Sequence, residues 1–276
     1  MNGDALTGLP TLRETLDAHG LLAKKSFGQH FLLDLNVTRK IVRLAGPLAG
    51  RAVIEVGPGP GGLTRALLES DASRIVAVEK DARFIPLLEE LAAAAGGRLQ
   101  VVGADALTVD EPALAGAAPW RVISNLPYNV GTPLLVKWLT APEPPEAMTL
   151  MFQKEVAQRI VARTGEGAYG RLGVLAQALA EARLVMDLPA RAFTPPPKVD
   201  SAVVHLTMRP DRPDPATVRA LERVTQAAFG QRRKMLRSSL KPLGGEALLD
   251  RAGIEPSARA EEIPVEGFLR LANALA

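Results

Sequence analysis

The sequence predicts an α/β fold in which a doubly wound parallel sheet is followed by a small all-helical segment. Short runs of β-branched and apolar residues alternate with helical patterns between residues 52 and 163, and such alternation is typical of parallel strands joined by crossover helices. The first run, at 52–56, leads directly into a cluster of glycines, and a helical pattern begins near Gly61. Residues 216–276 show helical periodicity only. We therefore expect an N-terminal appendage at 1–23, a sheet domain at 24–209 and a helical domain at 216–276.

The other predicted elements follow from the same patterns. Asp34 and Asp81 are placed to cap two of the helices, and Thr132 a third. The helix after Asp81 runs to about Ala94 and contains Pro86, which should remove one backbone hydrogen bond. The predicted strands of the sheet lie at 52–56, 74–80, 99–102, 120–124, 147–152 and 199–208.

Length and composition limit the classes of function. With 276 residues, of which 47% are hydrophobic, the chain can bury a substantial core. It contains no cysteine and three scattered histidines, which excludes disulfides, thiol catalysis and cysteine-ligated metals and argues against a histidine-rich metal site. No apolar run approaches the roughly 20 residues that span a bilayer, and the first residues lack a signal-peptide pattern. We therefore expect a cytoplasmic protein without a bound metal.

The basic residues are concentrated near the C-terminus, although the net charge is only +3. Between Arg223 and Gly245 there is no acidic residue, and the six basic residues there are Arg223, Arg232, Arg233, Lys234, Arg237 and Lys241. Clustered positive charge of this kind suits the phosphate backbone of a nucleic acid. This segment is the first candidate for an RNA-binding surface.

The N-terminal residues give two alternatives. Residues 10–18 can form a short helix that ends at Gly20, and we interpret it as an appendage without chemistry of its own. In the next segment, Lys24 and Lys25 precede an aromatic-flanked Gly28-Gln29 pair. That segment is either a basic loop that closes onto the core or a lid that touches both a cofactor and a polyanion.

The glycine cluster predicts a nucleotide-like ligand. Gly57, Gly59 and Gly62 satisfy the dinucleotide fingerprint G-x-G-x-x-G and equally the turn that holds S-adenosylmethionine. Pro58 and Pro60 remove two N–H donors that a pyrophosphate would use, which favours S-adenosylmethionine over NAD. The alternative is a turn that merely reverses the chain.

Acidic residues follow two of the strands. Glu79 ends the second strand some twenty residues past the glycines, where a carboxylate can accept hydrogen bonds from both ribose hydroxyls. Asp105 follows the third strand and is a candidate acceptor for the amine of an adenine. For each residue the alternative is an exposed acid at a strand end. Because the carboxyl ends of parallel strands share one edge, Glu79, Asp105 and Asn125 should line one crevice.

The fourth strand runs into Asn125-Leu-Pro-Tyr128, which suits methylation of an adenine amine. The lone pair of that amine is delocalised into the ring, and acceptors at the Asn125 side chain and the Pro127 carbonyl would favour a pyramidal nitrogen. Tyr128 can stack on the base, and Phe193, held by the prolines at 195–197, is a candidate second stacking wall. The alternatives are a plain turn with Tyr128 in the core, and a core phenylalanine.

These residues resemble the ribosomal RNA adenine N6,N6-dimethyltransferase family (KsgA type), from about Lys24 to the C-terminus. The resemblance implies a Rossmann-like class I methyltransferase sheet with a small helical RNA-binding domain. It also implies S-adenosylmethionine-dependent dimethylation of two adjacent adenines near the 3′ end of small-subunit (16S) rRNA, with a role in subunit maturation. The motifs that carry it are residues 25–32, 55–59, 125–128, 193–201, 229–234 and 259–262.

The resemblance also assigns residues to roles. The partner would be 16S rRNA or its assembly particle, and no obligatory protein partner is evident. The residues that would contact the cofactor are Gln29, His30, Leu32, Gly57, Gly59, Glu79, Asp105 and Asn125. Those that would hold the target base are Asn125, Pro127, Tyr128 and Phe193. From their positive charge, and not from the resemblance, the residues expected to contact RNA are Lys24, Lys25, Lys198, Arg232, Arg233, Lys234 and Arg237.

One position departs from the family, and three rival functions stay open. The family usually has Asn where this chain has His30; if the side chain contacts the cofactor, its affinity becomes pH-sensitive. The nearest rival is an antibiotic-resistance enzyme that methylates a large-subunit adenine, although Leu126 and the Asp200-Ser201 pair favour the small-subunit type. The others are an RNA-binding assembly factor without activity and an NAD-dependent dehydrogenase, which would leave the motif at 125–128 unexplained.

Overall fold

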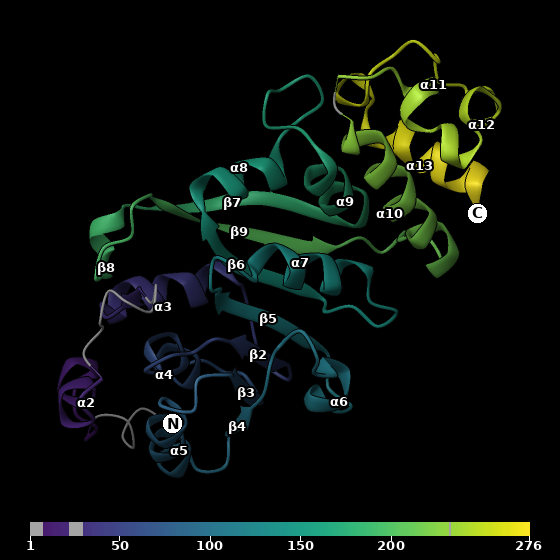
Figure 1. Cartoon of the computed structure of the whole chain (residues 1–276). Helices are drawn as coiled ribbons and strands as arrows, with labels where there is room; N and C mark the ends of the chain where they lie inside the picture. Colours follow the sequence, from purple (N-terminus) through teal and green to yellow (C-terminus); the bar gives the residue numbers. More distant parts are fainter. Residues whose placement is uncertain (1–7, 22–29, 232) are drawn as a thin grey trace. The chain divides into compact units, whose positions relative to one another are not determined.

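The computed structural model describes residues 8–21, 30–231 and 233–276 (Figure 1). By contacts, the chain forms two compact units. The first contains the described residues up to Leu134, together with Pro145–Lys154 and Leu184–His205. The second contains Leu135–Pro144, Glu155–Arg183 and Leu206–Ala276. This division by contacts differs from the predicted boundary between 209 and 216, which divides the chain by function and stays a prediction.

A seven-stranded sheet organises the structure; it contains the six predicted strands and one at 180–188 that was not predicted. Its order is β4-β3-β2-β5-β6-β9-β7, and the first five strands in this order are parallel. The strands are β2 (Ala52–Val56), β3 (Arg74–Glu79), β4 (Leu99–Gly103), β5 (Trp120–Asn125), β6 (Ala147–Gln153), β7 (Ala180–Leu188) and β9 (Ser201–Met208).

The order of the strands reverses between β2 and β5. From β2 the chain proceeds outward to β3 and β4, and β5 returns to the other side of β2 before β6 continues away from it. Ala52 is paired with both Arg74 and Trp120, so the three strands begin together and their carboxyl ends share one edge. In open α/β sheets, ligands bind in the crevice outside the carboxyl ends at such a reversal. The glycine turn after β2 and the end of β5 therefore meet where a ligand is expected.

Of the caps predicted for the first unit, Asp34 is confirmed and Asp81 is wrong, because the helix after Asp81 begins only at Ile85 and its N-cap is Phe84. Thr11, Asp34 and Asp110 are N-caps whose side chains accept backbone N–H bonds. The expectation that Pro86 removes a backbone hydrogen bond is wrong. Its helix starts at Ile85, so Pro86 lies in the first turn, where backbone N–H groups have no acceptor within the helix. The helices are α2 (Leu12–Ala18), α3 (Leu35–Leu44), α4 (Gly62–Leu68), α5 (Ile85–Ala94) and α6 (Glu111–Ala115).

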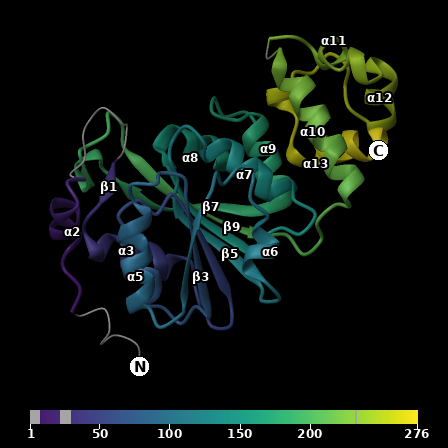
Figure 2. The same cartoon turned by 60° about the horizontal axis from the view of Figure 1, so that its bottom comes forward.

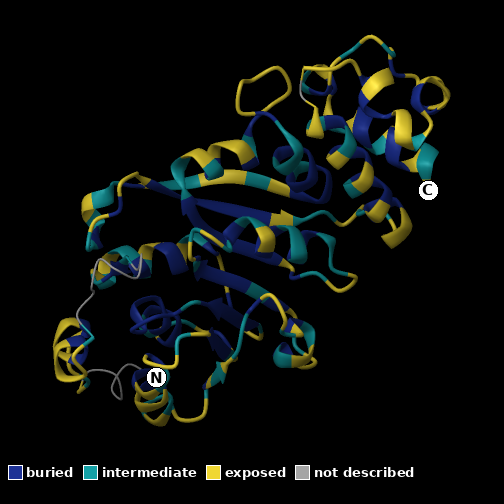
Figure 3. Cartoon of the chain, viewed as in Figure 1, coloured by how far each residue is buried: buried dark blue, intermediate teal, exposed yellow. Residues whose placement is uncertain are grey.

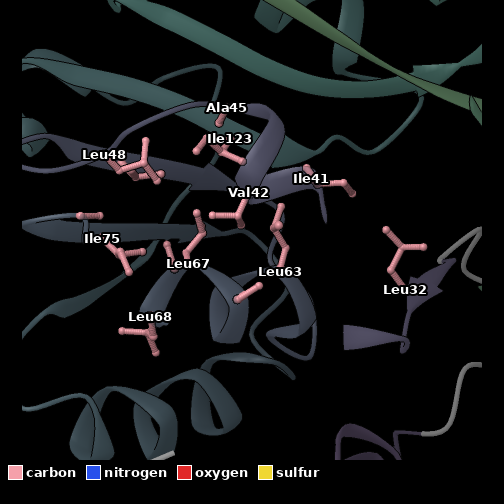
Figure 4. Close-up of a cluster of buried hydrophobic side chains, with 14 of the residues drawn as sticks. Leu32, Ile41, Val42, Ala45, Leu48, Leu63, Leu67, Leu68, Ile75 and Ile123 are labelled. Atoms are coloured by element: carbon pink, nitrogen blue, oxygen red, sulfur yellow. The ribbon is translucent and has the colours of Figure 1, made fainter. Parts of the chain in front are cut away.

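The core of the first unit lies between the sheet and the helices α3 and α4. All five residues of β2 are buried. Strands β3, β5, β6 and β9 are also buried along most of their length, while the outer sides of α2 and α5 are exposed (Figure 3). Figure 4 shows Ile41 and Val42 of α3 beside Leu63 and Leu67 of α4, with Ile123 of β5 in the same cluster. Each fully buried side chain of this size contributes about 1.5–3 kcal/mol. This core fixes the strand ends that carry the site.

A two-stranded ribbon joins the N-terminal segment to a distant part of the chain. Strand β1 (Phe31–Leu32) pairs antiparallel with β8 (Phe193–Thr194), with Leu32 opposite Phe193. The ribbon brings the predicted cofactor residues near 30–32 beside the predicted base-stacking residue. Nothing in the local sequence pattern predicts this pairing.

The second unit is mainly helical, and the predicted C-terminal helices are confirmed. Helix α10 packs along α13, and both contact α9 (Figure 2). Its core includes Phe268, which stacks on Phe229 with ring centroids 5.4 Å apart. Its helices are α8 (Lys154–Val161), α9 (Arg171–Leu179), α10 (Pro215–Gly230), α11 (Leu236–Ser239), α12 (Gly245–Ala252) and α13 (Val265–Leu275).

Helix α7 (Gly131–Thr140) starts one residue before the predicted cap Thr132, so that capping prediction is wrong. Across the described ranges, no helix is long and apolar enough to cross a membrane.

Candidate active site

A cavity of about 460 Å³ lies at the reversal point of the sheet, within the first unit. Its size is within the usual range for small-molecule sites. The glycine turn and the ends of β2 and β3 form one wall, and the end of β5 and the residues that follow it form the other. The lining residues are His30, Phe31, Leu32, Glu55, Gly57, Pro58, Gly59, Pro60, Gly62, Leu63, Glu79, Phe84, Asn125, Leu126, Pro127, Tyr128, Asn129 and Phe193.

The glycine turn needs its glycines because other segments approach it closely. Gly57 has φ of +67°, a conformation that side chains disfavour, and a Cβ there would lie 3.1 Å from the Pro127 ring. At Gly62 a Cβ would lie 2.6 Å from the Leu32 carbonyl oxygen, which real structures do not tolerate. The turn is therefore in contact with both the Asn125–Tyr128 segment and the β1 ribbon, so that one cavity includes all three.

Glu79 reaches the cavity as an oriented carboxylate. It is 7% exposed, and its two oxygens accept the N–H groups of Gly59 at 3.0 Å and Asp81 at 2.8 Å. Burial raises the pKa of Glu79, while these two hydrogen bonds act in the opposite direction. Its side chain is thereby fixed against the glycine turn, and each oxygen retains a lone pair for another donor.

Glu55 is a site residue that the sequence reasoning missed. It is 1% exposed, it lines the cavity, and its Oε2 accepts the Thr64 hydroxyl at 2.6 Å. Burial raises the pKa of Glu55 to about 8, so this group is protonated at neutral pH. The signal for it was an acid in the middle of a wholly apolar strand, because unpaired acids are almost never fully buried.

The Asn125–Tyr128 segment is arranged only partly as predicted. Asn125 is the last residue of β5, and its side chain lines the cavity. The Pro127 carbonyl accepts the N–H groups of Val130 and Gly131, both at 3.1 Å, at the start of α7. Both lone pairs of that oxygen are therefore engaged, and it has to release one of them before it can accept an adenine amine.

Tyr128 is half-buried at the cavity wall and held by its hydroxyl. The hydroxyl forms a 2.7 Å hydrogen bond with Ser201 Oγ at the start of β9. Burial raises the pKa of Tyr128, so the phenol stays neutral. The side chain is therefore part of the cavity lining and has one fixed end.

Phe193 belongs to the core and to the cavity at the same time. It is 3% exposed and packs in the main buried cluster, yet it also lines the cavity. Its segment is fastened by His30, whose Nδ1 is 2.7 Å from the Pro195 carbonyl oxygen. The ring of His30 is also tilted toward that of Tyr128, with centroids 6.1 Å apart. In this chain the side chain of His30 thus connects the N-terminal segment with the segment that bears Phe193.

Several predicted residues lie elsewhere. Asp105 is not among the lining residues: its carboxylate pairs with Lys80 at 2.8 Å and accepts the Leu107 N–H at 3.0 Å, beyond the end of β4. Its role as a cofactor contact stays a prediction. Four predicted residues, Lys24, Lys25, Gln29 and Arg232, lie outside the described residues.

The other predicted RNA contacts are exposed. Arg233, Lys234 and Arg237 are exposed residues of the second unit. Their segment is held in place by the Leu236 N–H, which donates to the Ala258 carbonyl at 2.8 Å. Lys198 is exposed in the first unit, in the proline-rich segment after Phe193. The exposure of these four cations is compatible with contact to a polyanion.

Comparison with solved structures identifies the fold. A dimethyladenosine transferase from Plasmodium falciparum superimposes with a TM-score of 0.74 at 23% identity, covering 88% of this chain and 96% of that one. The 23S rRNA methyltransferase ErmE superimposes with a TM-score of 0.67 at 30% identity, covering 89% and 99%. The sheet is therefore of the methyltransferase kind.

Sequence comparison gives the family. The ribosomal RNA small subunit methyltransferase A of Phenylobacterium zucineum is 68% identical over 270 residues, which is 98% of this chain and 94% of that protein. The protein of the same name from Caulobacter vibrioides is 67% identical over 253 residues, or 92% and 97%. The family described as ribosomal RNA adenine dimethylase matches residues 20–276. The chain therefore belongs to the ribosomal RNA adenine dimethylase family.

Proposed function

We propose that this protein dimethylates the N6 amines of two adjacent adenines near the 3′ end of small-subunit (16S) rRNA, with S-adenosylmethionine as methyl donor. We further propose that it acts in the cytoplasm on 16S rRNA or its assembly particle, during maturation of the small subunit. The support is the identity of 58–68% to proteins named ribosomal RNA small subunit methyltransferase A. It is strengthened by the cavity that places Asn125 and Tyr128 opposite the glycine turn.

The cavity residues fit the proposed cofactor. Gly57 and Gly59 leave the backbone accessible to a ligand, and Glu79 offers two oriented oxygens suited to ribose hydroxyls. Leu32 and Phe84 supply apolar surface for a base. We assign the same role of cofactor contact to His30 and Asn125, and beyond the described cavity to Gln29 and Asp105. When bound, S-adenosylmethionine supplies a methyl group already activated on a sulfonium.

The chain's own contribution is positioning. Asn125 Oδ1 accepts a hydrogen bond from the adenine amine, which directs the nitrogen lone pair away from the ring plane. Tyr128 stacks on the base, and Phe193 bounds the site from the side of the β1 ribbon. The Pro127 carbonyl becomes a second acceptor only if one of its two bonds to the start of α7 opens. No nucleophilic residue is required, so preorganised hydrogen bonding and alignment account for the rate.

The basic segment of the second unit supplies RNA affinity in this proposal. Arg233, Lys234 and Arg237 are exposed and attract phosphates. Contacts to phosphates do not distinguish one RNA sequence from another. Arg232, Lys24, Lys25 and Lys198 are assigned the same role. Target choice then depends on the base that enters the cavity.

One rival function has specific support, and an observation speaks against another. The similarity to ErmE at 30% identity favours a large-subunit target, but the identity to small-subunit enzymes is about twice as high. Asp200 and Ser201, which favour the small-subunit type, both have structural contacts: Asp200 accepts the Ala190 N–H at 2.8 Å, and Ser201 bonds to Tyr128. An RNA-binding factor without activity would not need Asn125 at the cavity wall.

The decisive experiment is a map of the modified bases. The protein is incubated with labelled S-adenosylmethionine and either unmethylated small subunits or large subunits. We expect label in two adjacent N6,N6-dimethyladenosines near the 3′ end of 16S rRNA. Label in the large subunit would favour the resistance-type enzyme, and RNA binding without label would favour the assembly factor.

A further inference from the structure

The N-terminal helix α2 is firmly built. At its start, Thr11 and Glu14 form a capping box, in which the Thr11 N–H donates to Glu14 Oε2 at 2.7 Å and the Glu14 N–H to Thr11 Oγ1 at 3.3 Å. At its end, Gly20 has φ of +64° and the Leu21 N–H donates to the Leu16 carbonyl at 2.8 Å, which is a Schellman motif. Seven residues are too few for a stable isolated helix. Its caps and its packing therefore hold it.

The buried face of α2 contacts the outer side of the cavity wall. Leu16 is 1% exposed and belongs to one cluster with Phe31, Phe84 and two leucines of α5. Phe31 and Phe84 pack edge to face, with centroids 5.6 Å apart and an interplanar angle of 80°. Both rings also line the cavity. The two rings are thus bordered by Leu16 and by the cavity, so Leu16 limits how far they can withdraw from it.

A second residue of α2 contacts the glycine turn itself. Leu12 is buried, and a Cβ placed on Gly62 would lie 3.2 Å from its Cδ1 atom. The same Cβ would lie 2.6 Å from the Leu32 carbonyl oxygen. Gly62 is the first residue of α4 and lines the cavity. Leu12 therefore packs at the point where the glycine turn and the β1 ribbon meet.

Polar contacts fasten α2 to the two helices behind the cavity. Arg65 of α4 donates to the Pro10 carbonyl at 2.6 Å and to Thr15 Oγ1 at 3.4 Å. His19 Nε2 lies 3.5 Å from Glu90 Oε1 of α5. The family match begins at residue 20, so α2 lies before the region that the family description covers.

We propose that α2 is a positioning element of the cofactor site: it holds Phe31, Phe84 and Gly62 in the positions that bind the cofactor. The inference rests on the proposed function of the cavity. It adds to that function a role for a segment that the sequence pattern marks only as an appendage. Removal of the α2 packing is expected to weaken cofactor binding while leaving the transfer rate at saturating cofactor nearly unchanged, because Asn125 ends β5 and Tyr128 is bonded to Ser201, both outside the cluster that contains Leu16.

The test compares two leucines that are equally buried. Leu16→Ala removes the packing against Phe31 and Phe84, whereas Leu48→Ala opens the main core of the same unit at a residue that does not itself line the cavity. Calorimetry with S-adenosylmethionine gives the Kd, and thermal unfolding gives the Tm. We expect both variants to lower the Tm, but only Leu16→Ala to raise the Kd, by about tenfold. Equal Kd values for the two variants would overturn the proposal.

A second pair of variants avoids the core. Thr11→Ala removes the cap of α2, and Asp110→Ala removes the cap of α6, which contributes no residue to the cavity lining. We expect a two- to threefold higher Kd for Thr11→Ala and no change for Asp110→Ala; a Kd unchanged in both Thr11→Ala and Leu16→Ala would refute the role of α2. If the unaltered protein does not bind S-adenosylmethionine, the proposed function fails. If it binds and the α2 variants bind equally well, only the role of α2 fails.

Discussion

The two walls of the cavity are built in different ways. The wall of the glycine turn consists of buried strand ends, and its two acidic side chains, Glu55 and Glu79, are already hydrogen-bonded to Thr64, Gly59 and Asp81. The opposite wall consists of the end of β5 with the residues that follow it, 125–129, and of Phe193 in the short strand β8. Those segments are held by two side-chain bonds, Tyr128 to Ser201 and His30 to Pro195. The first wall is therefore fixed throughout by the core, whereas the second combines the core-packed Phe193 with the partly exposed residues 127–129, which a few polar contacts hold.

This difference suits two ligands of different kinds. A small cofactor gains affinity from a preorganised site. A base that leaves an RNA helix has to enter between side chains, and a wall with few constraints allows that movement. Variants of the first wall should therefore change cofactor affinity, and variants of the second should change transfer or RNA affinity.

The largest expected effect is at Asn125. Asn125→Ala removes the acceptor for the adenine amine and should lower the rate of methyl transfer by about 10²–10³-fold, as for loss of one preorganised hydrogen-bond group. The Kd for the cofactor should stay within several-fold. Asn129→Ala is the matched control, because Asn129 lines the same cavity and has no assigned role. Undiminished transfer by Asn125→Ala would reject the positioning role.

The next effect is at Glu79. Glu79→Gln replaces an acceptor-only group by an amide, and hydrogen bonds to charged groups contribute about 1.5–3 kcal/mol. Cofactor affinity should fall by about tenfold or more, while the transfer rate at saturating cofactor is retained. Glu69→Gln, which alters an exposed pair with Arg39, serves as control. A lower transfer rate with an unchanged Kd would contradict the assignment of Glu79 to cofactor binding.

A smaller effect concerns RNA affinity. Charge reversal at Arg233 and Arg237 should weaken RNA binding and flatten its salt dependence, with the slope reduced by about 0.7 for each single-strand phosphate that is no longer neutralised. Reversal at the exposed Arg219 of α10 controls for net charge. The measurement is the Kd for a small-subunit RNA fragment across a range of salt concentrations, and an unchanged slope would remove these residues from the interface.

His30 tests the link between the walls. His30→Ala removes the bond to the Pro195 carbonyl and should raise the KM for RNA a few-fold, because the segment that bears Phe193 loses a constraint. His30→Asn retains a side-chain N–H and should recover part of the loss. Cofactor binding measured from pH 5 to 8 gives the complementary result: identical curves for the protein and His30→Asn would exclude a side-chain contact with the cofactor.

Glu55 gives a prediction about pH and stability. Its pKa in the folded protein is about 8, against 4.5 ordinarily, so the folded state binds one more proton than the unfolded state between these values. Stability should therefore fall as pH rises from about 4.5 through 8. Glu55→Gln removes this dependence, so its Tm relative to the unaltered protein should rise with pH. A constant difference in Tm from pH 5 to 8 would contradict the assignment.

Local patterns predicted the first wall well and the second only in part. The strand at 52–56, the glycine turn and Glu79 are close in sequence, so periodicity and spacing were enough. The pairing of Leu32 with Phe193 joins residues about 160 apart, and the bond of His30 to Pro195 depends on it. The two hydrogen bonds that the Pro127 carbonyl accepts at the start of α7 could not be predicted from the sequence either, because they depend on where that helix begins. Glu55 was overlooked, although an acid inside an apolar strand is itself a signal.

The most direct test of the two-wall account is a double-mutant cycle on Glu79→Gln and Asn125→Ala. Cofactor Kd and the single-turnover transfer rate at saturating cofactor are measured for both single variants and for the double variant. We predict that Glu79 sets most of the change in Kd while Asn125 alters the Kd by no more than several-fold, that the rate follows Asn125 alone, and that the two effects combine without coupling. A transfer rate in the double variant that departs from that of Asn125→Ala by more than a few-fold, or a Kd set by Asn125, would contradict it.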